Sequence, residues 1–315
     1  MTSNLNLNDR AVLLAGNVVE RSAELRIDVH DIGGVQVLDF GVDASGGLSA
    51  GLILARMCMA DLAEINVQSA GSLIDVPNVV VHTDHPLHAC LMSQYAGWKI
   101  ATDDYFAMGS GPMRVTAGSE DLFQEFPATD PSLACVGVLE AGSLPTQSAT
   151  AAVRSGVGED KNVILAVAPT SSQAGNLQVV ARSVETAMHK LHELHFPVEK
   201  VVSGCGVAPL PPVAKGDLEG IGRTNDSILY GTTVNLWVDC EDEVIEEFGP
   251  QTPSKSSDSH GQPFLKLFKE ANHDFYALDK NLFSPAVVIF HNLSTGRSFR
   301  FGDFAPQLLH DSFGI

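Results

Sequence analysis

Positive charge is scarce in this chain. Its 315 residues include 19 Lys and Arg against 38 Asp and Glu, which gives a formal net charge of −19. Nucleic acids and anionic membranes both attract proteins through basic patches, so we expect no nucleic-acid partner and no membrane partner. The acidic residues are spread along the chain without a long run of like charge. This pattern favours solubility and does not indicate an acidic tail.

Paired cysteines and long apolar runs are also missing. The cysteines are odd in number, far apart and without a C-x-x-C motif; they are Cys58, Cys90, Cys135, Cys205 and Cys240. They indicate neither a disulfide framework nor a thiolate zinc site, and we expect them to be reduced and mostly buried. No window of 18 apolar residues predicts a transmembrane helix, and the polar N-terminus is unlike a signal peptide. We therefore expect a cytoplasmic protein.

Strand and helix patterns fill most of the chain. Two short strands flank Gly33 and Gly34, which predicts a hairpin. From Leu133 onward apolar strands alternate with helices, and helical spacing continues through residues 177–194. This alternation predicts sheets covered by helices. A shift in composition near residues 126–132 suggests a division into two lobes.

Arg182 and Glu185 lie three residues apart within the predicted helix over 177–194. That spacing brings two side chains onto one helical face, about 5–6 Å apart at Cβ. A permanent cation can then hold and tune a carboxylate that transfers a proton, which is the minimum that a hydrolase needs. Surface ion pairs commonly have the same spacing, so the spacing alone leaves both interpretations open.

Two polar segments offer groups for a ligand. Residues 103–112, DDYFAMGSGP, end in a small-residue turn whose backbone N–H groups could bind an anion, although a plain tight turn needs the same residues. Residues 222–231, GRTNDSILYG, place four hydrogen-bonding side chains on a predicted loop before an apolar strand. Loops held by a rigid scaffold often bind ligands.

Histidines recur at intervals of three in two places: His82, His85 and His88, and then His189, His192 and His195. Pro86 interrupts the first set and no characteristic zinc spacing is matched, so we expect no metal. The second set favours a solvated helix C-terminus, where protonated imidazoles interact well with the helix dipole. The segment GCGVAP has Pro209 where a dinucleotide fingerprint has its third glycine, which argues against a nicotinamide cofactor.

Several motifs taken together resemble methenyltetrahydromethanopterin cyclohydrolase. They are DFGVDASGGLSAGL, VHTDHP, AGWKIATDDYFAMGSGPMR, ILAVAPTSSQAGNLQVVARSVETAMHKL, GVAPLPPVA, IGRTNDSILYG, GQPFLKLF and NLSTG. The resemblance is collinear and extends to the final SFGI. It implies an α+β fold of two mixed α/β lobes with a substrate cleft between them, assembled as a homotrimer. It also implies reversible addition of water to the cationic methenyl form of a pterin carrier, which yields the formyl form.

The resemblance places the family's catalytic pair on Arg182 and Glu185. Glu185 would act as the general base for water, most effectively if partial burial lifts its pKa from ~4.3 toward ambient pH, and Arg182 would oppose too large a rise. The residues that would bind the pterin are Asp84, Tyr105, Ser110, Gly111, Pro112, Arg223, Thr224, Asn225 and Asp226. No metal and no cofactor are expected, since tetrahydromethanopterin is the one-carbon carrier substrate.

The lobes are expected over residues 1–130 and 131–280, the second carrying the catalytic helix. A C-terminal hairpin over 281–315 could pack on the first lobe. Two alternative functions stay open: a methenyl-tetrahydrofolate cyclohydrolase, and a non-catalytic pterin-binding protein. The direction of the pathway, methanogenesis or formaldehyde oxidation, is also open.

Overall fold

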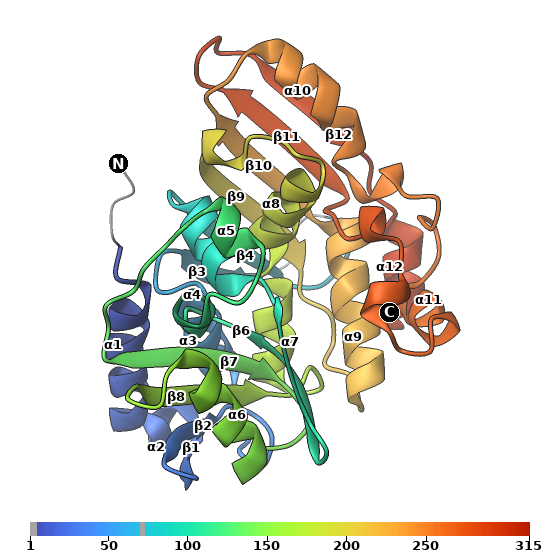
Figure 1. Ribbon diagram of the computed structural model, residues 1–315. Helices are drawn as coiled ribbons and strands as arrows, with labels where there is room; N and C mark the ends of the chain where they lie inside the picture. The colour runs from blue at the N-terminus through green and yellow to red at the C-terminus, as the bar shows by residue number, and fades with distance from the viewer. Residues whose placement is uncertain (1–4, 70–72) are drawn as a thin grey trace. The chain divides into compact units, whose positions relative to one another are not determined.

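Two compact units make up the chain, and each draws on separate stretches of sequence. The computed structural model describes residues 5–69 and 73–315 (Figure 1). Unit 1 comprises residues 1–63 and 88–178, and unit 2 comprises residues 64–87 and 179–315. Each unit contains one open mixed sheet with helices packed on it. The expected α+β class with two lobes is therefore confirmed.

Unit 1 is built on a six-stranded sheet of order β1-β2-β8-β7-β6-β5. Its strands are β1 (Asp28–Ile32), β2 (Val35–Asp39), β5 (Trp98–Thr102), β6 (Tyr105–Ser110), β7 (Ala134–Glu140) and β8 (Asn162–Ala168). Its helices are α1 (Leu7–Glu20), α2 (Ser22–Leu25), α3 (Leu48–Cys58), α4 (Met113–Ala117), α5 (Leu122–Glu125) and α6 (Gln147–Val157). The π-helix η1 (Leu87–Gln94) leads into this unit, and α7 (Gln173–Val180) leads out of it.

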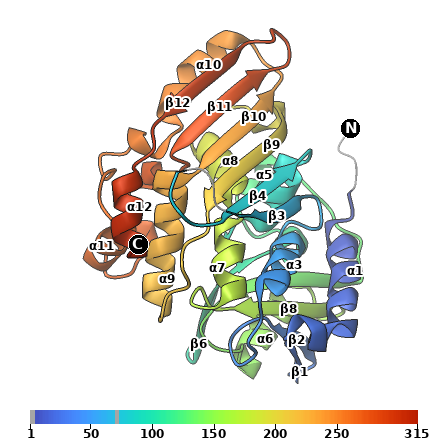
Figure 2. The same cartoon turned by 180° about the vertical axis from the view of Figure 1, so that it is seen from behind.

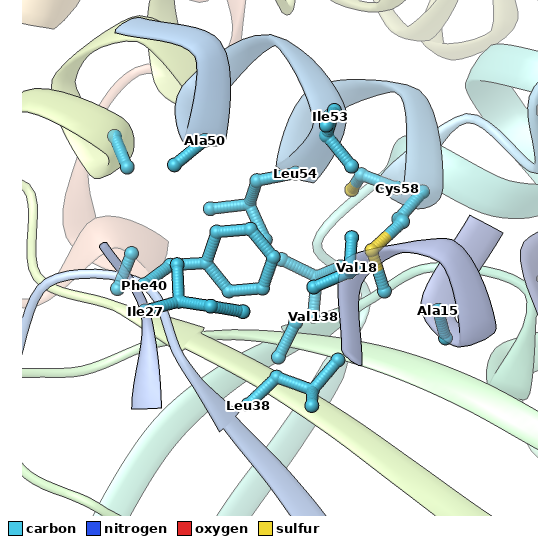
Figure 3. Packing of buried hydrophobic residues seen from close by; sticks show 14 of the residues in the cluster. Ala15, Val18, Ile27, Leu38, Phe40, Ala50, Ile53, Leu54, Cys58 and Val138 are labelled. Carbon is cyan, nitrogen blue, oxygen red and sulfur yellow. The ribbon is translucent and has the colours of Figure 1, made fainter. Parts of the chain in front are cut away.

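Both faces of this sheet are covered by helices. Helices α1 and α3 pack on one face around Leu38 and Phe40 (Figure 3), and α6 packs on the other around Val35 and Val37. The central strands β2, β8 and β7 are parallel. Because these strands are buried on both faces, the sequence reads as near-continuous apolar runs such as ACVGVLE. The hairpin predicted around Gly33 and Gly34 is confirmed as β1–β2.

Unit 2 has its own six-stranded sheet, of order β12-β11-β10-β9-β4-β3. Its strands are β3 (Glu64–Gln68), β4 (Asn78–Thr83), β9 (Val201–Pro209), β10 (Thr233–Val238), β11 (Val287–Asn292) and β12 (Ser298–Gly302). Its α-helices are α8 (Ser183–Glu193), α9 (Asp217–Asp226), α10 (Asp242–Phe248), α11 (Phe264–Glu270) and α12 (Pro306–Phe313). Shorter helical turns are η2 (Val198–Lys200), η3 (Ser227–Gly231), η4 (Gly249–Gln251), η5 (Ser254–Ser256), η6 (Phe275–Ala277) and η7 (Lys280–Leu282).

Helix α8 packs on one face of this second sheet, against β9, β10 and β4. Figure 2 shows the other face, with strands β9 to β12 toward the viewer. A separate apolar cluster joins α9, α11 and α12, with Tyr230, Phe264 and Leu309 fully buried. Within the described residues, no helix has both the length and the apolar character needed to cross a membrane.

Two predictions about secondary structure are wrong. The helix expected over residues 177–194 is broken at Ala181 and Arg182 into α7 and α8. The β-branched pair Val179 and Val180 precedes the break, and the Arg182 N–H bonds the Val179 carbonyl in a tightened turn. The polar segment Arg223–Asp226, expected to be a loop, is the last part of helix α9.

The core of unit 1 gives a direct stability test. Phe40 is fully buried between α1, α3 and the sheet (Figure 3), so Phe40→Ala should lower the free energy of unfolding by about 3–5 kcal/mol. Leu13 on α1 is 77% exposed, and Leu13→Ala should cost under about 0.5 kcal/mol. Denaturant titrations of both variants measure the difference. Equal losses in the two would contradict the placement of Phe40.

Candidate active site

Arg182 and Glu185 come together at the start of α8. Arg182 is the residue that caps the helix, and its carbonyl accepts the Thr186 N–H at 2.8 Å. Glu185 lies in the first turn. The Arg182 Nη1 and Glu185 Oε2 atoms are 3.9 Å apart, and the two side chains are 11% and 7% exposed. This burial separates the pair from the common surface ion pair of the same spacing.

Three forces act on the Glu185 carboxylate. The helix N-terminus and the Arg182 guanidinium both stabilise its negative charge. Removal from water destabilises that charge. A buried carboxylate beside a guanidinium contains the groups that general-base chemistry uses, so Glu185 is a candidate base.

Glycines in β9 fix the position of this helical turn. A Cβ built on Gly206 would lie 2.2 Å from the Ser183 Oγ, and one on Gly204 would lie 2.6 Å from a Val184 methyl carbon. Ser183 and Val184 are fully buried. The segment GCGVAP therefore has glycines because the first turn of α8 approaches the β9 backbone closely.

Asp84 lies just beyond the end of β4, where its Oδ1 accepts a hydrogen bond of 2.7 Å from the Ser203 hydroxyl. Ser203 is adjacent to Gly204 on β9, and neighbouring residues of a strand point to opposite faces. Gly204 faces α8, so Ser203 and the Asp84 carboxylate lie on the other face of the sheet. The structure does not bring Asp84 to the side of the sheet that holds Arg182 and Glu185.

The four side chains at the end of α9 bond mainly to their own unit. Thr224 Oγ1 donates to the Gly220 carbonyl at 3.0 Å, Asn225 Nδ2 donates to Ile221 at 2.8 Å, and Arg223 Nη1 donates to Pro212 at 3.1 Å. Thr224 is fully buried. These contacts hold the helix together, and the role of the residues as pterin ligands stays a prediction.

The buried carboxylate of Asp226 on α9 accepts hydrogen bonds from two other helices. Its Oδ1 accepts the Phe264 N–H of α11 at 2.8 Å, and its Oδ2 accepts the Ser312 hydroxyl of α12 at 2.6 Å. Asp226 is 1% exposed, and burial raises its pKa to about 7. The role of Asp226 visible in the structure is to join α9, α11 and α12.

In unit 1, Tyr105, Ser110, Gly111 and Pro112 are all buried. The Tyr105 hydroxyl donates to the Ser143 carbonyl at 3.4 Å, and burial raises the pKa of the phenol. The Gly111 N–H bonds the Ser93 carbonyl at 2.8 Å, and Gly111 has a φ of +90°, which favours glycine. In this turn the backbone donor of Gly111 is therefore used within the fold.

Sequence reasoning missed Lys190, which lies on α8 and is only 1% exposed. Its Nζ donates to the Asn281 side-chain oxygen at 2.6 Å, and desolvation lowers its pKa to about 8. Its position three residues after the buried Ala187 is the local sign of burial, because residues three apart share a helix face. It ties the end of α8 to η7.

The described part of the chain contains no group of three or more His, Cys, Asp or Glu side chains placed to hold a metal ion. His82 lies 3.8 Å from Glu64 as part of an exposed pair on neighbouring strands. His195 is exposed just beyond the end of α8. His189 is less exposed than His82 and His195, since its side chain is only 20% exposed, and it faces Glu193.

Comparison with known proteins gives the class to which this chain belongs. Residues 6–313 match the family model described as Cyclohydrolase (MCH). The match covers nearly the whole chain, so the protein belongs to this cyclohydrolase family and is an enzyme of the hydrolase class.

The relatives bear the name that the motifs suggested. Proteins called methenyltetrahydromethanopterin cyclohydrolase are similar to this chain in Rhodopirellula baltica (50% identity, covering 90% of this chain and 87% of the relative) and Methylobacillus flagellatus (40%, covering 96% and 93%). A third, from Methanococcoides burtonii, is 39% identical and covers 99% of both chains. The resemblance seen in the sequence is thereby confirmed.

Asp226 generates a prediction about pH. Its pKa of about 7 in the fold exceeds the unfolded value of ~3.9, so folding favours the protonated acid. The resulting stabilisation is complete below about pH 4 and is lost as the pH rises to about 7. Asp226→Asn cannot ionise and keeps both hydrogen-bonding partners, so its stability relative to the parent should rise across that window, by up to about 4 kcal/mol. Thermal melts between pH 4.5 and 8 measure this, and a constant difference would contradict it.

Proposed function

We propose that this protein catalyses the reversible hydrolysis of methenyl-tetrahydromethanopterin to formyl-tetrahydromethanopterin, with Glu185 as general base. The observation on which the proposal depends is the buried Arg182–Glu185 pair at the start of α8. The names of the relatives support the substrate. The reaction belongs to one-carbon metabolism, and we propose that it takes place in the cytoplasm without a metal or a cofactor.

The chemistry needs a positioned and deprotonated water. The methenyl carbon lies between two nitrogens that share its positive charge, so it is already electrophilic. Glu185 takes a proton from water as the oxygen adds to that carbon, which gives the ring-closed carbinol. One C–N bond of the carbinol then breaks, and the hydroxyl proton passes to the released nitrogen, which leaves the formyl group on the other nitrogen. In the reverse direction, protonated Glu185 gives its proton to the departing hydroxyl of the ring-closed carbinol.

Arg182 has a distinct task in this mechanism. At 3.9 Å it stabilises the ionised carboxylate and restricts its orientation. The planar guanidinium also offers several donors in a fixed geometry, which an ammonium group cannot reproduce. The residues predicted to bind the pterin would then orient the substrate against the pair.

Replacement of the base tests the proposal. Glu185→Gln keeps the shape of the side chain but cannot accept a proton, so kcat should fall by about 10²–10⁴-fold with KM largely unchanged. The loss of the near-ultraviolet absorbance of the methenyl group measures turnover. Arg182→Lys provides a second variant and should also lower kcat.

The same assay separates the alternatives. Comparable turnover of the methenyl-tetrahydrofolate analogue by the parent protein would replace the proposed substrate. Binding of either pterin without turnover would indicate a pterin-binding protein. Activity of Glu185→Gln within a few-fold of the parent would remove Glu185 from the mechanism.

We also propose that three copies of the chain form a homotrimer. A charge of −19 on each chain opposes assembly at low ionic strength. Salt screens this repulsion, with a Debye length of ~10 Å at 0.1 M and ~3 Å at 1 M. Trimer formation and thermal stability should therefore increase from low to molar salt, as measured by light scattering and melting curves. A monomer at every salt concentration would refute both the trimer and the electrostatic argument.

A further inference from the structure

Helix α8 continues beyond Glu185 with a row of titratable side chains. His189 follows Glu185 by four residues, and Glu193 follows His189 by four. Residues four apart on a helix are neighbours on one face. The three residues, a glutamate, a histidine and a glutamate, therefore lie in a row on one face of α8.

Exposure rises steadily along this row. The Glu185 side chain is 7% exposed, His189 is 20% exposed and Glu193 is 34% exposed. The row thus leads from a buried acid–base group to a carboxylate in contact with solvent.

The outer end of the row is held in place. The His189 Nε2 and Glu193 Oε1 atoms are 3.8 Å apart. The other oxygen of Glu193 accepts a hydrogen bond of 3.2 Å from the Lys280 Nζ on η7. The Lys280 ammonium keeps this carboxylate beside the imidazole. Asp279 and the buried Lys190 also contribute charge near this end of α8.

Each turnover of the proposed reaction releases one proton. A cation and a water molecule become a neutral formyl product and H⁺, and the proton arrives first on Glu185. Because Glu185 is almost entirely buried, it must pass this proton on before it can act as a base again. Imidazole is well suited to this step, since its pKa lies near neutrality and its two nitrogens can accept and release a proton on opposite sides.

We propose that His189 relays the proton from Glu185 to Glu193 and solvent. One ring nitrogen takes the proton from the Glu185 carboxyl group, and the other releases a proton to the Glu193 carboxylate, which gives it to buffer. When the enzyme forms the methenyl group from the formyl group, the same steps run in reverse and return a proton to Glu185. The relay rests on the proposed function and adds His189 to it as a proton-transfer residue that acts through Glu185.

His189→Gln is the direct test, because glutamine suits a helix and cannot carry a proton. In forward assays at low buffer concentration, kcat should fall about tenfold or more while KM stays unchanged. Added imidazole buffer should restore most of the lost kcat, since it can enter at the partly exposed position of His189 and carry the proton in place of the missing ring. Glu193→Gln should show a smaller loss with the same rescue.

His195→Asn is the matched control. His195 is exposed beyond the end of α8 and has a φ of +64°, a conformation that asparagine tolerates. This variant should match the parent at every buffer concentration.

The possible outcomes separate the relay from the proposed function. If His189→Gln has the kcat of the parent protein at low buffer concentration, the relay is wrong and the proposed reaction still stands. A loss of kcat that imidazole does not restore would have the same meaning. Lack of turnover by the parent protein would refute the function itself. The relay is supported if His189→Gln loses kcat and imidazole restores it, while His195→Asn keeps the kcat of the parent protein and does not respond to imidazole.

Discussion

Close packing of the first turn of α8 on β9 determines where the candidate active site lies. Gly204 and Gly206 have no side chains, so Ser183 and Val184 rest on the strand backbone itself. The opposite side of the same turn then presents Arg182 and Glu185. Any side chain at Gly206 would push this turn outward. The geometry of the pair therefore depends on two residues that have no functional groups.

Several buried polar side chains of unit 2 form hydrogen bonds that hold its helices together. Asp226 joins three helices, Lys190 holds η7, and Thr224 bonds its own helix. The fixed partners of these side chains restrict their positions. The Arg182–Glu185 pair has a 3.9 Å separation between Nη1 and Oε2.

The sequence predicted the strands well, because alternating or continuous apolar runs bounded by glycine specify them closely; β1, β2, β7 and β8 are examples. It also identified the family and the spacing of Arg182 and Glu185. The sequence did not predict the break between α7 and α8, because the apolar residues keep their helical spacing across the break. It also did not predict the end of α9, because the polar residues there are typical of a loop. The burial of Lys190 and of Asp226 depends on partners distant in the chain, such as Asn281 and Ser312, which local patterns cannot reveal.

The interleaving of the two units has a consequence for synthesis on the ribosome. Strand β4 ends at Thr83, but its partner β9 begins only at Val201. Translation proceeds at about 5–20 residues per second, so roughly 6–24 s pass between the synthesis of the β3–β4 hairpin and the synthesis of the first residue of β9. During that interval one edge of β4 offers unpaired backbone groups to any other chain nearby. Unit 1 can fold during this interval. The nascent chain then contains a folded unit 1 together with a β3–β4 hairpin that has not yet paired with β9.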